Sequence, residues 1–407
     1  MKRREFLINS AAAGAAAVLF AGCSKTIKGF KPKVQTRNFN GLNISLLGFG
    51  CSHLPDNYPD IYGINMTELE RMIDYSLKRG INYFDASYLA SKGMAERAIG
   101  AVLKKYKRGS FFLADKSPIH KLWSKGDVRR IFREQCQNLR TPYIDFYMCH
   151  QLDDGNVSRY RELNMYDELL KLKNEGEIKH LGFSFHGTPE LLKELVKEHK
   201  WDFVYLQLNY ADWKNLKAQE QYEIARKENI PVIVMLPLRG SRLINLKGRA
   251  LEVLKENCPD AKPADFGLRW AASKEGVITV LSGMSTIEQI RENADTFSEF
   301  KPMTEHELKT ADKIAEVLRS QGEINCTACR YCLSVCPENI NIPASLFLYS
   351  EYKVTKDSRF YNMNYKSFSK DERPDKCTKC GLCRKICPQH LDIPKLLSDA
   401  AEQAKQP

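Results

Sequence analysis

The sequence lacks several features that would place it in other classes of protein. Its apolar run, Phe6 to Phe20, is too short to span a bilayer as a stable helix, so no membrane-embedded body is expected. The excess of lysine and arginine over aspartate and glutamate gives a net charge of +12. These basic residues form no dense block, which argues against a nucleic-acid partner. Four cysteines show no paired spacing, so a disulfide framework is not expected. They are Cys51, Cys136, Cys149 and Cys258.

The N-terminus has the layout of an export signal, with a charged start before the apolar run. Arg3 to Leu7 (RREFL) resembles the twin-arginine motif, whose export route carries proteins that are already folded. Phe20 to Cys23 resembles the cleavage box of a bacterial lipoprotein, with Cys23 as the lipidated residue. We therefore expect a signal peptide over residues 1–22 and a periplasmic protein with a lipid anchor. A signal peptide cleaved without lipid attachment is the alternative.

Eight of the thirteen cysteines fall into two copies of the spacing CxxCxxCxxxCP. The first copy holds Cys326, Cys329, Cys332 and Cys336, and the second holds Cys377, Cys380, Cys383 and Cys387. This spacing is typical of proteins with two [4Fe–4S] clusters, in which the fourth cysteine of each motif ligates the other cluster. Crossed ligation therefore groups Cys387 with the first motif and Cys336 with the second. A pair of structural zinc sites is the alternative.

Residues 34–300 alternate short apolar runs with amphipathic stretches of helix length. Asn40-Gly41 indicates a type I′ hairpin before the main fold. Eight strand-length runs, each followed by a helix-length segment, predict an α/β fold of the (β/α)8 TIM-barrel type. The strands are expected at Ile44–Gly50, Ile81–Ala86, Phe111–Ala114, Ile144–Cys149, His180–Ser184, Phe203–Gln207, Pro231–Met235 and Val277–Leu281.

Two further segments complete the expected organisation. Residues 301–322 are predicted to be a helical connector, and residues 323–400 a small C-terminal α-helical domain of the dicluster ferredoxin type. In the barrel, chemistry is expected where strands end at their carboxyl side. The residues at such positions are Cys51, Asp85, Lys116, His150 and Ser184.

Motifs at these strand ends resemble the aldo-keto reductases over residues 34–300. They are Asn82 to Asp85, Lys116 after Phe111 to Ala114, Asp145 to His150, Gly182 to Ser184, and Ser282 to Ser285. The C-terminal tail resembles the ferredoxin extension of one branch of that family. The resemblance implies transfer of a hydride between a nicotinamide and a carbonyl or alcohol substrate.

The resemblance also implies catalytic roles. In that family a tyrosine protonates the carbonyl oxygen, a lysine paired with an aspartate lowers the pKa of the tyrosine, and a histidine orients the substrate. Matching the motifs assigns three of these roles to Asp85, Lys116 and His150. The position of the tyrosine holds Ala90, which has no proton to donate. Tyr88, on the same loop, is the candidate replacement.

The nicotinamide site implied by the resemblance is altered too. Phe185 stands where the family has an asparagine, and Tyr205 where it has a glutamine. Gly283 and Gln289 replace cations that would bind the 2′-phosphate of NADP, so no preference for NADP is claimed. NAD(P) stays a candidate cofactor. Its remaining contacts would be Gly50, Cys51, Ser184, Ser285, Glu292 and Asn293.

Together these observations predict an exported iron–sulfur oxidoreductase that acts on a carbonyl or alcohol. Free nicotinamide nucleotides are not expected outside the cytoplasm. A periplasmic enzyme would carry its nucleotide out already bound, or its two [4Fe–4S] clusters would connect the barrel to a redox partner protein or a quinone-linked donor. The alternative is an electron carrier or ligand-binding protein whose barrel has lost hydride transfer.

Overall fold

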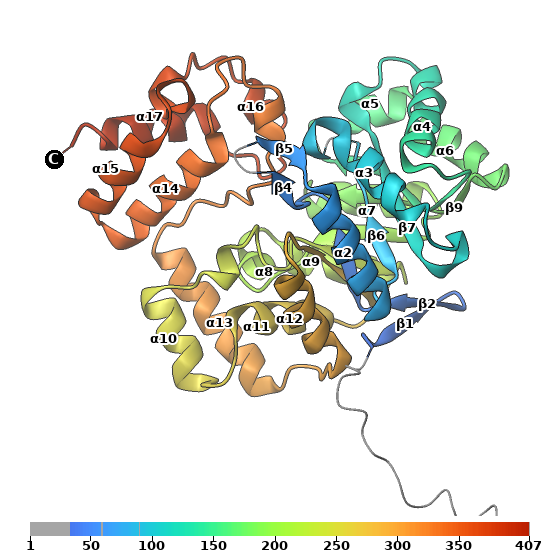
Figure 1. Cartoon of the computed structure of the whole chain (residues 1–407), viewed down its shortest axis with the longest axis horizontal. Helices are drawn as coiled ribbons and strands as arrows, with labels where there is room; N and C mark the ends of the chain where they lie inside the picture. The colour runs from blue at the N-terminus through green and yellow to red at the C-terminus, as the bar shows by residue number, and fades with distance from the viewer. Residues whose placement is uncertain (1–32, 58–59, 89, 407) are drawn as a thin grey trace, which may run out of the picture. The chain divides into compact units, whose positions relative to one another are not determined.

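The computed structural model of the chain describes residues 33–57, 60–88 and 90–406. The expected signal peptide and Cys23 lie outside these residues. Within them, eight parallel strands form a closed barrel with helices around it, and a helical domain follows (Figure 1). The predicted TIM-barrel fold with a C-terminal helical domain is therefore confirmed. Among the described residues we find no helix with the length and apolar character that a membrane span requires.

A β-hairpin precedes the barrel, as the Asn-Gly pair predicts. Strands β1 (Thr36–Phe39) and β2 (Leu42–Ser45) pair antiparallel, with Phe39 opposite Leu42. Asn40 and Gly41 between them have φ angles of 50° and 85°. Type I′ turns require positive φ at both central residues, which asparagine and glycine tolerate best.

The barrel closes because its last strand pairs with its first, so it has no free edge. Its strands are β3 (Leu47–Gly50), β6 (Tyr83–Asp85), β7 (Phe112–Pro118), β8 (Ile144–Leu152), β9 (Ile178–Phe185), β10 (Phe203–Gln207), β11 (Val232–Met235) and β12 (Val277–Gly283). Each predicted strand corresponds to one of these. The first is shorter than predicted, because Ile44 and Ser45 pair with β1 and the barrel strand begins only at Leu47.

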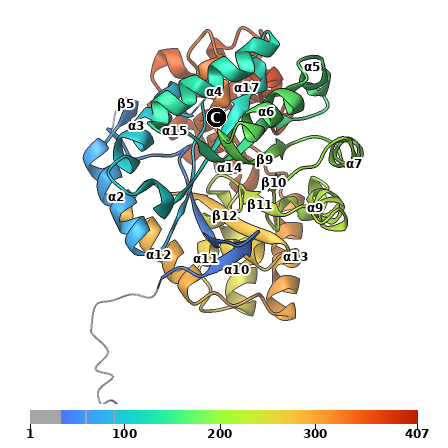
Figure 2. The same cartoon turned by 90° about the vertical axis from the view of Figure 1, so that its right-hand side faces the viewer.

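Helices cover the outside of the barrel on all sides (Figure 2). They are α2 (Met66–Lys78), α3 (Met94–Leu103), α4 (Lys125–Leu139), α5 (Val157–Glu162), α6 (Met165–Asn174), α7 (Pro189–Glu198), α8 (Asp212–Asn215), α9 (Ala218–Lys227), α10 (Gly248–Asn257), α11 (Pro263–Ala272) and α12 (Ile287–Ser298). A short antiparallel hairpin of β4 (Asp56–Asn57) and β5 (Asp60–Ile64) follows the first barrel strand, β3, in the chain. Helix α13 (Glu305–Ser320) begins with a capping box formed by Thr304 and Glu307.

The interior of the barrel is filled at one end by aromatic side chains. Tyr83, Phe146, Phe203 and Tyr205 are fully or almost fully buried there. Phe39 of the hairpin packs on Phe146, with ring centroids 5.3 Å apart, and so closes the amino end of the barrel. The hairpin and the C-terminal domain lie at opposite ends of the barrel (Figure 1). Only the carboxyl ends of the strands are therefore free to hold a site.

The C-terminal domain has its own small core around the cysteines. Its helices are α14 (Ile342–Thr355), α15 (Ser358–Ser367), α16 (Leu382–Lys385) and α17 (Ile393–Gln403), and the short 3-10 helix η5 spans Tyr331–Ser334. Ile340, Ile342, Leu346 and Leu397 are buried against the cysteine side chains. A second cluster, built on Tyr361 and Tyr365, holds α15 against α14 and α17. Apolar packing thus places both cysteine motifs on one compact body.

A buried ionic network fixes this domain to the mouth of the barrel. Arg239 and Arg242 follow β11, and both donate to the carboxylate of Glu323, over 2.7 Å and 2.9 Å. Arg239 also lies 3.1 Å from Asp212, which is fully buried. Arg242 donates to the backbone oxygen of Cys326 over 3.2 Å. Charges that lose their hydration this completely must be paired, so the segment after α13 has one well-defined position.

Backbone contacts continue along the same segment, which we call the mouth strap (Glu323–Tyr331). Nε2 of His53 lies 3.4 Å from the backbone oxygen of Ala328. Gly240 has φ +61°, and a Cβ atom there would lie 1.9 Å from the backbone oxygen of Thr327. Glycine at this position therefore allows the two backbones to touch.

Replacing Gly240 by alanine should lift the mouth strap from the barrel. A matched control is Gly248→Ala, because Gly248 also has positive φ (+49°) but nothing within 4 Å of the added Cβ. Both variants pay about 1–2 kcal/mol for left-handed backbone. Only Gly240→Ala should raise hydrogen–deuterium exchange over residues 323–331. Equal exchange in the two variants would contradict the contact.

Candidate functional site

A buried ion pair forms the base of the candidate site. Nζ of Lys116, on β7, donates to Oδ1 of Asp85, on β6, over 2.7 Å and to the backbone oxygen of Ala86 over 2.6 Å. Both side chains are almost completely buried. Their strands are neighbours in the barrel, so parallel pairing places the two groups side by side. The sequence predicted both residues, and the structure brings them together.

Tyr205 is a third member of this group that the sequence did not assign to it. Its hydroxyl donates to Oδ1 of Asp85 over 2.9 Å and lies 2.8 Å from the hydroxyl of Tyr83. Burial and the negative charge of Asp85 raise the pKa of Tyr205. A phenol thus occupies the position where the family resemblance implies a glutamine for the nicotinamide. The substitution was visible in the sequence, but the hydrogen bond to Asp85 was not.

His150 stands near the carboxyl end of β8 as a neutral imidazole. Burial lowers its pKa well below the ordinary value, and the positive charge of Lys116 acts in the same direction. Nδ1 is buried without a hydrogen-bond partner among the described residues. Nε2 lies 3.4 Å from the hydroxyl of Tyr331, and the two rings are perpendicular. A neutral imidazole in this position can hydrogen-bond the oxygen of a ligand.

Tyr331 belongs to the C-terminal domain, yet its hydroxyl reaches into the mouth of the barrel. It lies in η5, between Cys329 and Cys332 in the sequence. Burial, the sulfur of Cys329 and the charge of Asp85 raise its pKa, so it is a protonated phenol. Tyr88, the predicted replacement, instead donates to the carboxylate of Glu134 over 3.3 Å. The structure therefore offers a phenol beside His150 from a part of the chain that strand-end motifs could not reveal.

Most of the candidate cofactor residues lie around the neighbouring ends of β3 and β12, where Gly50 pairs with Gly283, but most of their polar groups have partners within the protein. Ser184 accepts from the backbone N–H of Gln151, Ser285 donates to the backbone oxygen of His53, and Asn293 donates to Ser282. The other three candidates also offer no open polar group. Glu292 pairs with Lys262 at the surface. Gly50 is part of β3, and Cys51 is a fully buried thiol. Phe185, fully buried, has no amide to offer a nicotinamide.

The eight motif cysteines surround two separate cavities. One is lined by Cys326, Cys329, Cys332 and Cys387, and the other by Cys336, Cys377, Cys380 and Cys383. This is the grouping that crossed ligation requires. Burial raises the pKa of most of these thiols, for example that of Cys383 to about 11. Among the described residues no three His, Cys, Asp or Glu side chains converge closely enough to hold a single metal ion. Four thiols around a void fit a cluster of several irons.

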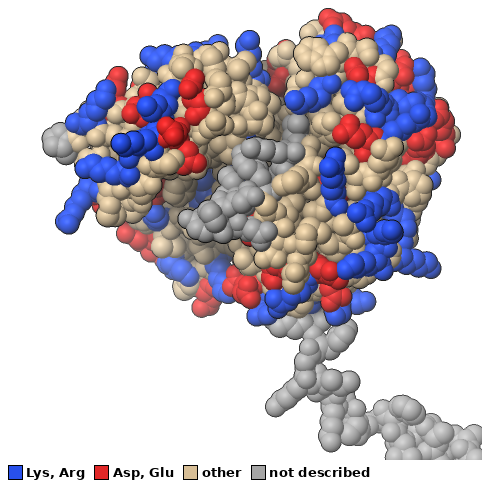
Figure 3. All heavy atoms as spheres, turned by 45° about the horizontal axis from the view of Figure 1, so that its top comes forward, with Lys and Arg blue, Asp and Glu red and all other residues tan. Residues whose placement is uncertain are grey.

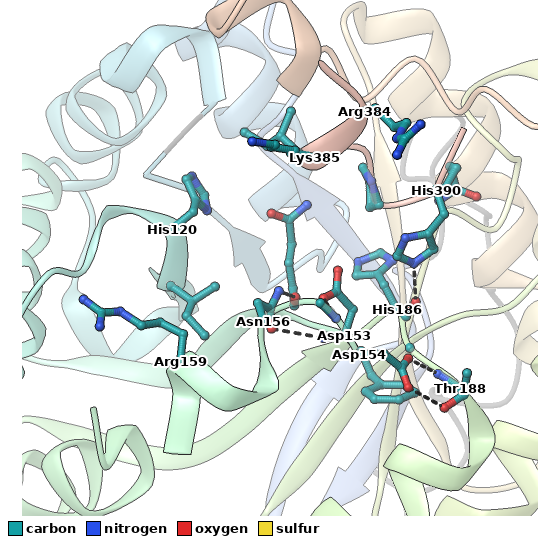
Figure 4. Close-up of a pocket in the computed structure, with 18 of the residues that line it drawn as sticks. His120, Asp153, Asp154, Asn156, Arg159, His186, Thr188, Arg384, Lys385 and His390 are labelled. Atoms are coloured by element: carbon teal, nitrogen blue, oxygen red, sulfur yellow. Dashed lines mark hydrogen bonds between the residues drawn. The ribbon is translucent and has the colours of Figure 1, made fainter. Parts of the chain in front are cut away.

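A wide cavity of about 1360 Å³ separates the barrel mouth from the C-terminal domain. Loops after β7, β8, β9 and β10 form one wall, and residues 382–390 with Val335 form the other. Figure 4 shows Arg384 and Lys385 on the second wall, facing His120, Arg159 and Asp153 on the first.

Hydrogen bonds between the two walls close this cavity on one side. Gln207 and Gln389 exchange hydrogen bonds of 2.8 Å and 3.2 Å, and Nε2 of His390 lies 3.1 Å from the backbone oxygen of His186. Gln151, the neighbour of His150, lines the cavity. So do Leu382 and Pro388, which are neighbours of Cys383 and Cys387. A ligand in this space would lie next to chain neighbours of His150, Cys383 and Cys387.

The fold and site define a barrel oxidoreductase joined to an iron–sulfur domain. The chain belongs to the aldo/keto reductase family, whose model matches residues 46–316, and a 4Fe-4S dicluster domain matches residues 325–392.

Individual relatives match the barrel region. The uncharacterized oxidoreductase YqkF of Bacillus subtilis is 25% identical over 66% of this chain and 92% of its own length. L-galactose dehydrogenase of Arabidopsis thaliana is 22% identical over 71% of this chain and 96% of its own. The aldo-keto reductase AKR11C1 from Bacillus halodurans, in its holo form, superposes with a TM-score of 0.59 at 24% identity, covering 70% of this chain and 96% of that one.

Removal of Lys116 should destabilise the barrel, since it leaves the buried carboxylate of Asp85 without its cation. We expect Lys116→Met to lower the free energy of unfolding by about 3–5 kcal/mol. Lys121→Met, at an exposed lysine a few residues further on, should change it little. Anaerobic urea denaturation followed by tryptophan fluorescence measures both. Similar stability of the two variants would show that the ion pair is unimportant.

Crossed ligation predicts which cysteine variants resemble one another. Cys387→Ser should alter the same electron paramagnetic resonance signal as Cys329→Ser, although 58 positions separate the two residues, because both line one cavity. Cys336→Ser should instead alter the signal that Cys380→Ser alters. Spectra of the reduced variants, with iron counts, decide this. If Cys387→Ser matched Cys380→Ser, each motif would bind its own cluster.

Proposed function

We propose that the chain is an exported iron–sulfur oxidoreductase that exchanges electrons between its dicluster domain and a carbonyl or alcohol bound at the barrel mouth. One observation carries the proposal: the hydroxyl of Tyr331 lies 3.4 Å from Nε2 of His150. Tyr331 is adjacent to Cys332 and two residues from Cys329. A substrate oxygen that accepted hydrogen bonds from both groups would lie beside the loop of the first cysteine motif.

The residues around this position suit an oxygen with partial negative charge. Lys116 supplies a fixed positive charge, paired with Asp85 so that it is held in place. His150 and Tyr331 supply polar groups at the mouth, where donors aimed at a developing oxyanion contribute most when they are held in advance. Reduction of a carbonyl to an alcohol consumes two electrons and two protons. The protons come from solvent through the cavity, and the electrons come from a one-electron reductant such as a reduced redox protein.

When bound, two [4Fe–4S] clusters held by the two groups of four cysteines supply one-electron storage and transfer. A nicotinamide fits the residues less well. Phe185 and Tyr205 offer no amide, and Tyr331 and the mouth strap cover the space next to His150 and His53. We therefore assign the electrons to the dicluster domain and no step to NAD(P). Export as a folded, lipid-anchored protein agrees with this source, because free nucleotides are not expected outside the cytoplasm.

The substrate is proposed to be a small polyhydroxylated molecule in the wide cavity. Amide and imidazole groups line it, among them Gln151, Gln207 and His120, and such groups hydrogen-bond hydroxyls. The relative named as an L-galactose dehydrogenase acts on a molecule of this kind. On the face in Figure 3, Lys and Arg are interleaved with Asp and Glu, so this face has no continuous basic surface for nucleic acid.

The proposal is tested with the cluster-loaded protein, reduced by dithionite and freed of excess reductant. Addition of 4-nitrobenzaldehyde or of an aldose should restore the visible absorption of oxidised clusters. Tyr331→Phe should slow this step by about 10²–10³-fold, as loss of one oxyanion donor does. Tyr88→Phe is the matched control and should have little effect, because the hydroxyl of Tyr88 faces Glu134.

Two outcomes would contradict the proposal. Rapid reduction of the oxidised clusters by NADPH, or a nucleotide that stays bound on purification, would return the electrons to a nicotinamide. Reduced clusters that no carbonyl reoxidises, in a protein that exchanges electrons with other redox proteins, would favour the electron-carrier alternative.

A further inference from the structure

We propose that the wide cavity selects an anionic polyhydroxylated ligand, a sugar acid by chemical class, whose carboxylate is held by Arg384 and Lys385. The inference deepens the proposed function by naming the substrate class. It rests on that function for the position of the reacting oxygen at His150, whereas the binding of the acid can be measured without any turnover.

The charges that line the cavity are predominantly positive. The cations are Lys121, Arg159, Arg384 and Lys385, and the carboxylates are Asp153 and Asp154. Both carboxylates are committed to backbone and hydroxyl donors. Asp154 accepts from the N–H and the hydroxyl of Thr188, over 2.8 Å and 2.7 Å, and Asp153 accepts from the N–H of Gly155 over 2.9 Å. The cations of the opposite wall are therefore not neutralised from within the cavity.

Arg384 and Lys385 differ from most of the arginines on the barrel. Arg129, Arg161 and Arg249 each make at least two contacts with glutamates on neighbouring elements or turns. Arg384 and Lys385, in contrast, form no ion pair within the part of the chain that the structure describes. They lie on α16, directly after Cys383, and point toward the cavity from its second wall (Figure 4). An adjacent guanidinium and ammonium, both unpaired, suit a carboxylate.

The first wall supplies neutral groups for the rest of such a ligand. Burial lowers the pKa of His120 and of His186 to about 4, so both are neutral at pH 7. Nε2 of His120 is buried and has no partner among the described residues. Trp123 is 79% exposed and lines the same space, which offers an aromatic face for the C–H side of a sugar ring. Neutral donors and an aromatic face opposite two cations match a sugar ring with one acidic end.

The cavity has room for such a ligand. Ligand pockets usually measure about 300–1,000 Å³, and this one, at about 1360 Å³, is larger than a single carbonyl compound needs. A sugar acid could place its carboxylate at α16 and its carbonyl or alcohol carbon near Gln151, the chain neighbour of His150. The same two cations could instead attract an acidic redox protein, and the experiment separates the two possibilities.

Calorimetry on the anaerobic, cluster-loaded protein tests the inference. The probes are D-galacturonate, D-gluconate and D-glucarate, with neutral D-galactose as the reference ligand. At least one acid should bind about tenfold or more tightly than galactose, a difference of roughly 1.4 kcal/mol. Its affinity should fall between 50 and 200 mM salt.

Charge-neutralising variants locate the carboxylate. Arg384→Gln/Lys385→Gln should reduce the affinity for the acid to that for galactose and leave galactose binding unchanged. Lys395→Gln, at an exposed lysine of α17 that does not line the cavity, is the matched control and should bind the acid as the parent does. An unchanged cluster spectrum shows that the double variant is folded.

Three results would overturn the inference. They are equal binding of acids and galactose, acid binding that the double variant keeps, and a double variant that only slows electron exchange with an acidic redox protein. The last result would assign the two cations to protein docking. Tight acid binding without reoxidation of reduced clusters would instead leave this inference standing and contradict the proposed function.

Discussion

The buried network of Arg239, Arg242, Glu323 and Asp212 is the interaction on which the rest of the site depends. Two guanidinium groups from the barrel share one carboxylate from the segment that follows α13, and the removal of any member would leave an uncompensated buried charge. Because this network sets the position of the mouth strap, it also sets the position of Tyr331. The second wall of the wide cavity belongs to the same domain and is held in part by the same anchor.

The barrel and the C-terminal domain both contribute side chains to the mouth of the barrel. The motif alignment places Ala90 where the resemblance implies a tyrosine, and Phe185 and Tyr205 where it implies amides for a nicotinamide. The C-terminal domain adds a phenol, that of Tyr331, beside His150 at the mouth of the barrel. It also adds two sets of four cysteines. In the function proposed above, the changes in the barrel and the added domain belong together, because both move the source of electrons from a nicotinamide to the dicluster domain.

Much of the fold could be read from the sequence, because it depends on local patterns. Alternating apolar runs gave eight strands, and Asn40-Gly41 gave the hairpin. The pair of Asp85 and Lys116 could also be expected, since both end neighbouring strands. The remainder depends on contacts between residues far apart in the chain. Nothing local to Tyr331 shows that it meets His150, 181 positions earlier. Tyr205 reads as a core aromatic until its hydroxyl is seen on Asp85.

The position of Tyr331 between two cysteine ligands has a consequence for the history of the molecule. A residue that serves the barrel is part of the loop that surrounds the first iron–sulfur cavity, so neither domain can be replaced by a relative's without damage to the other. The two domains are interdependent at this one loop. The protein should therefore diverge as a unit, and recombination at the domain boundary should be selected against.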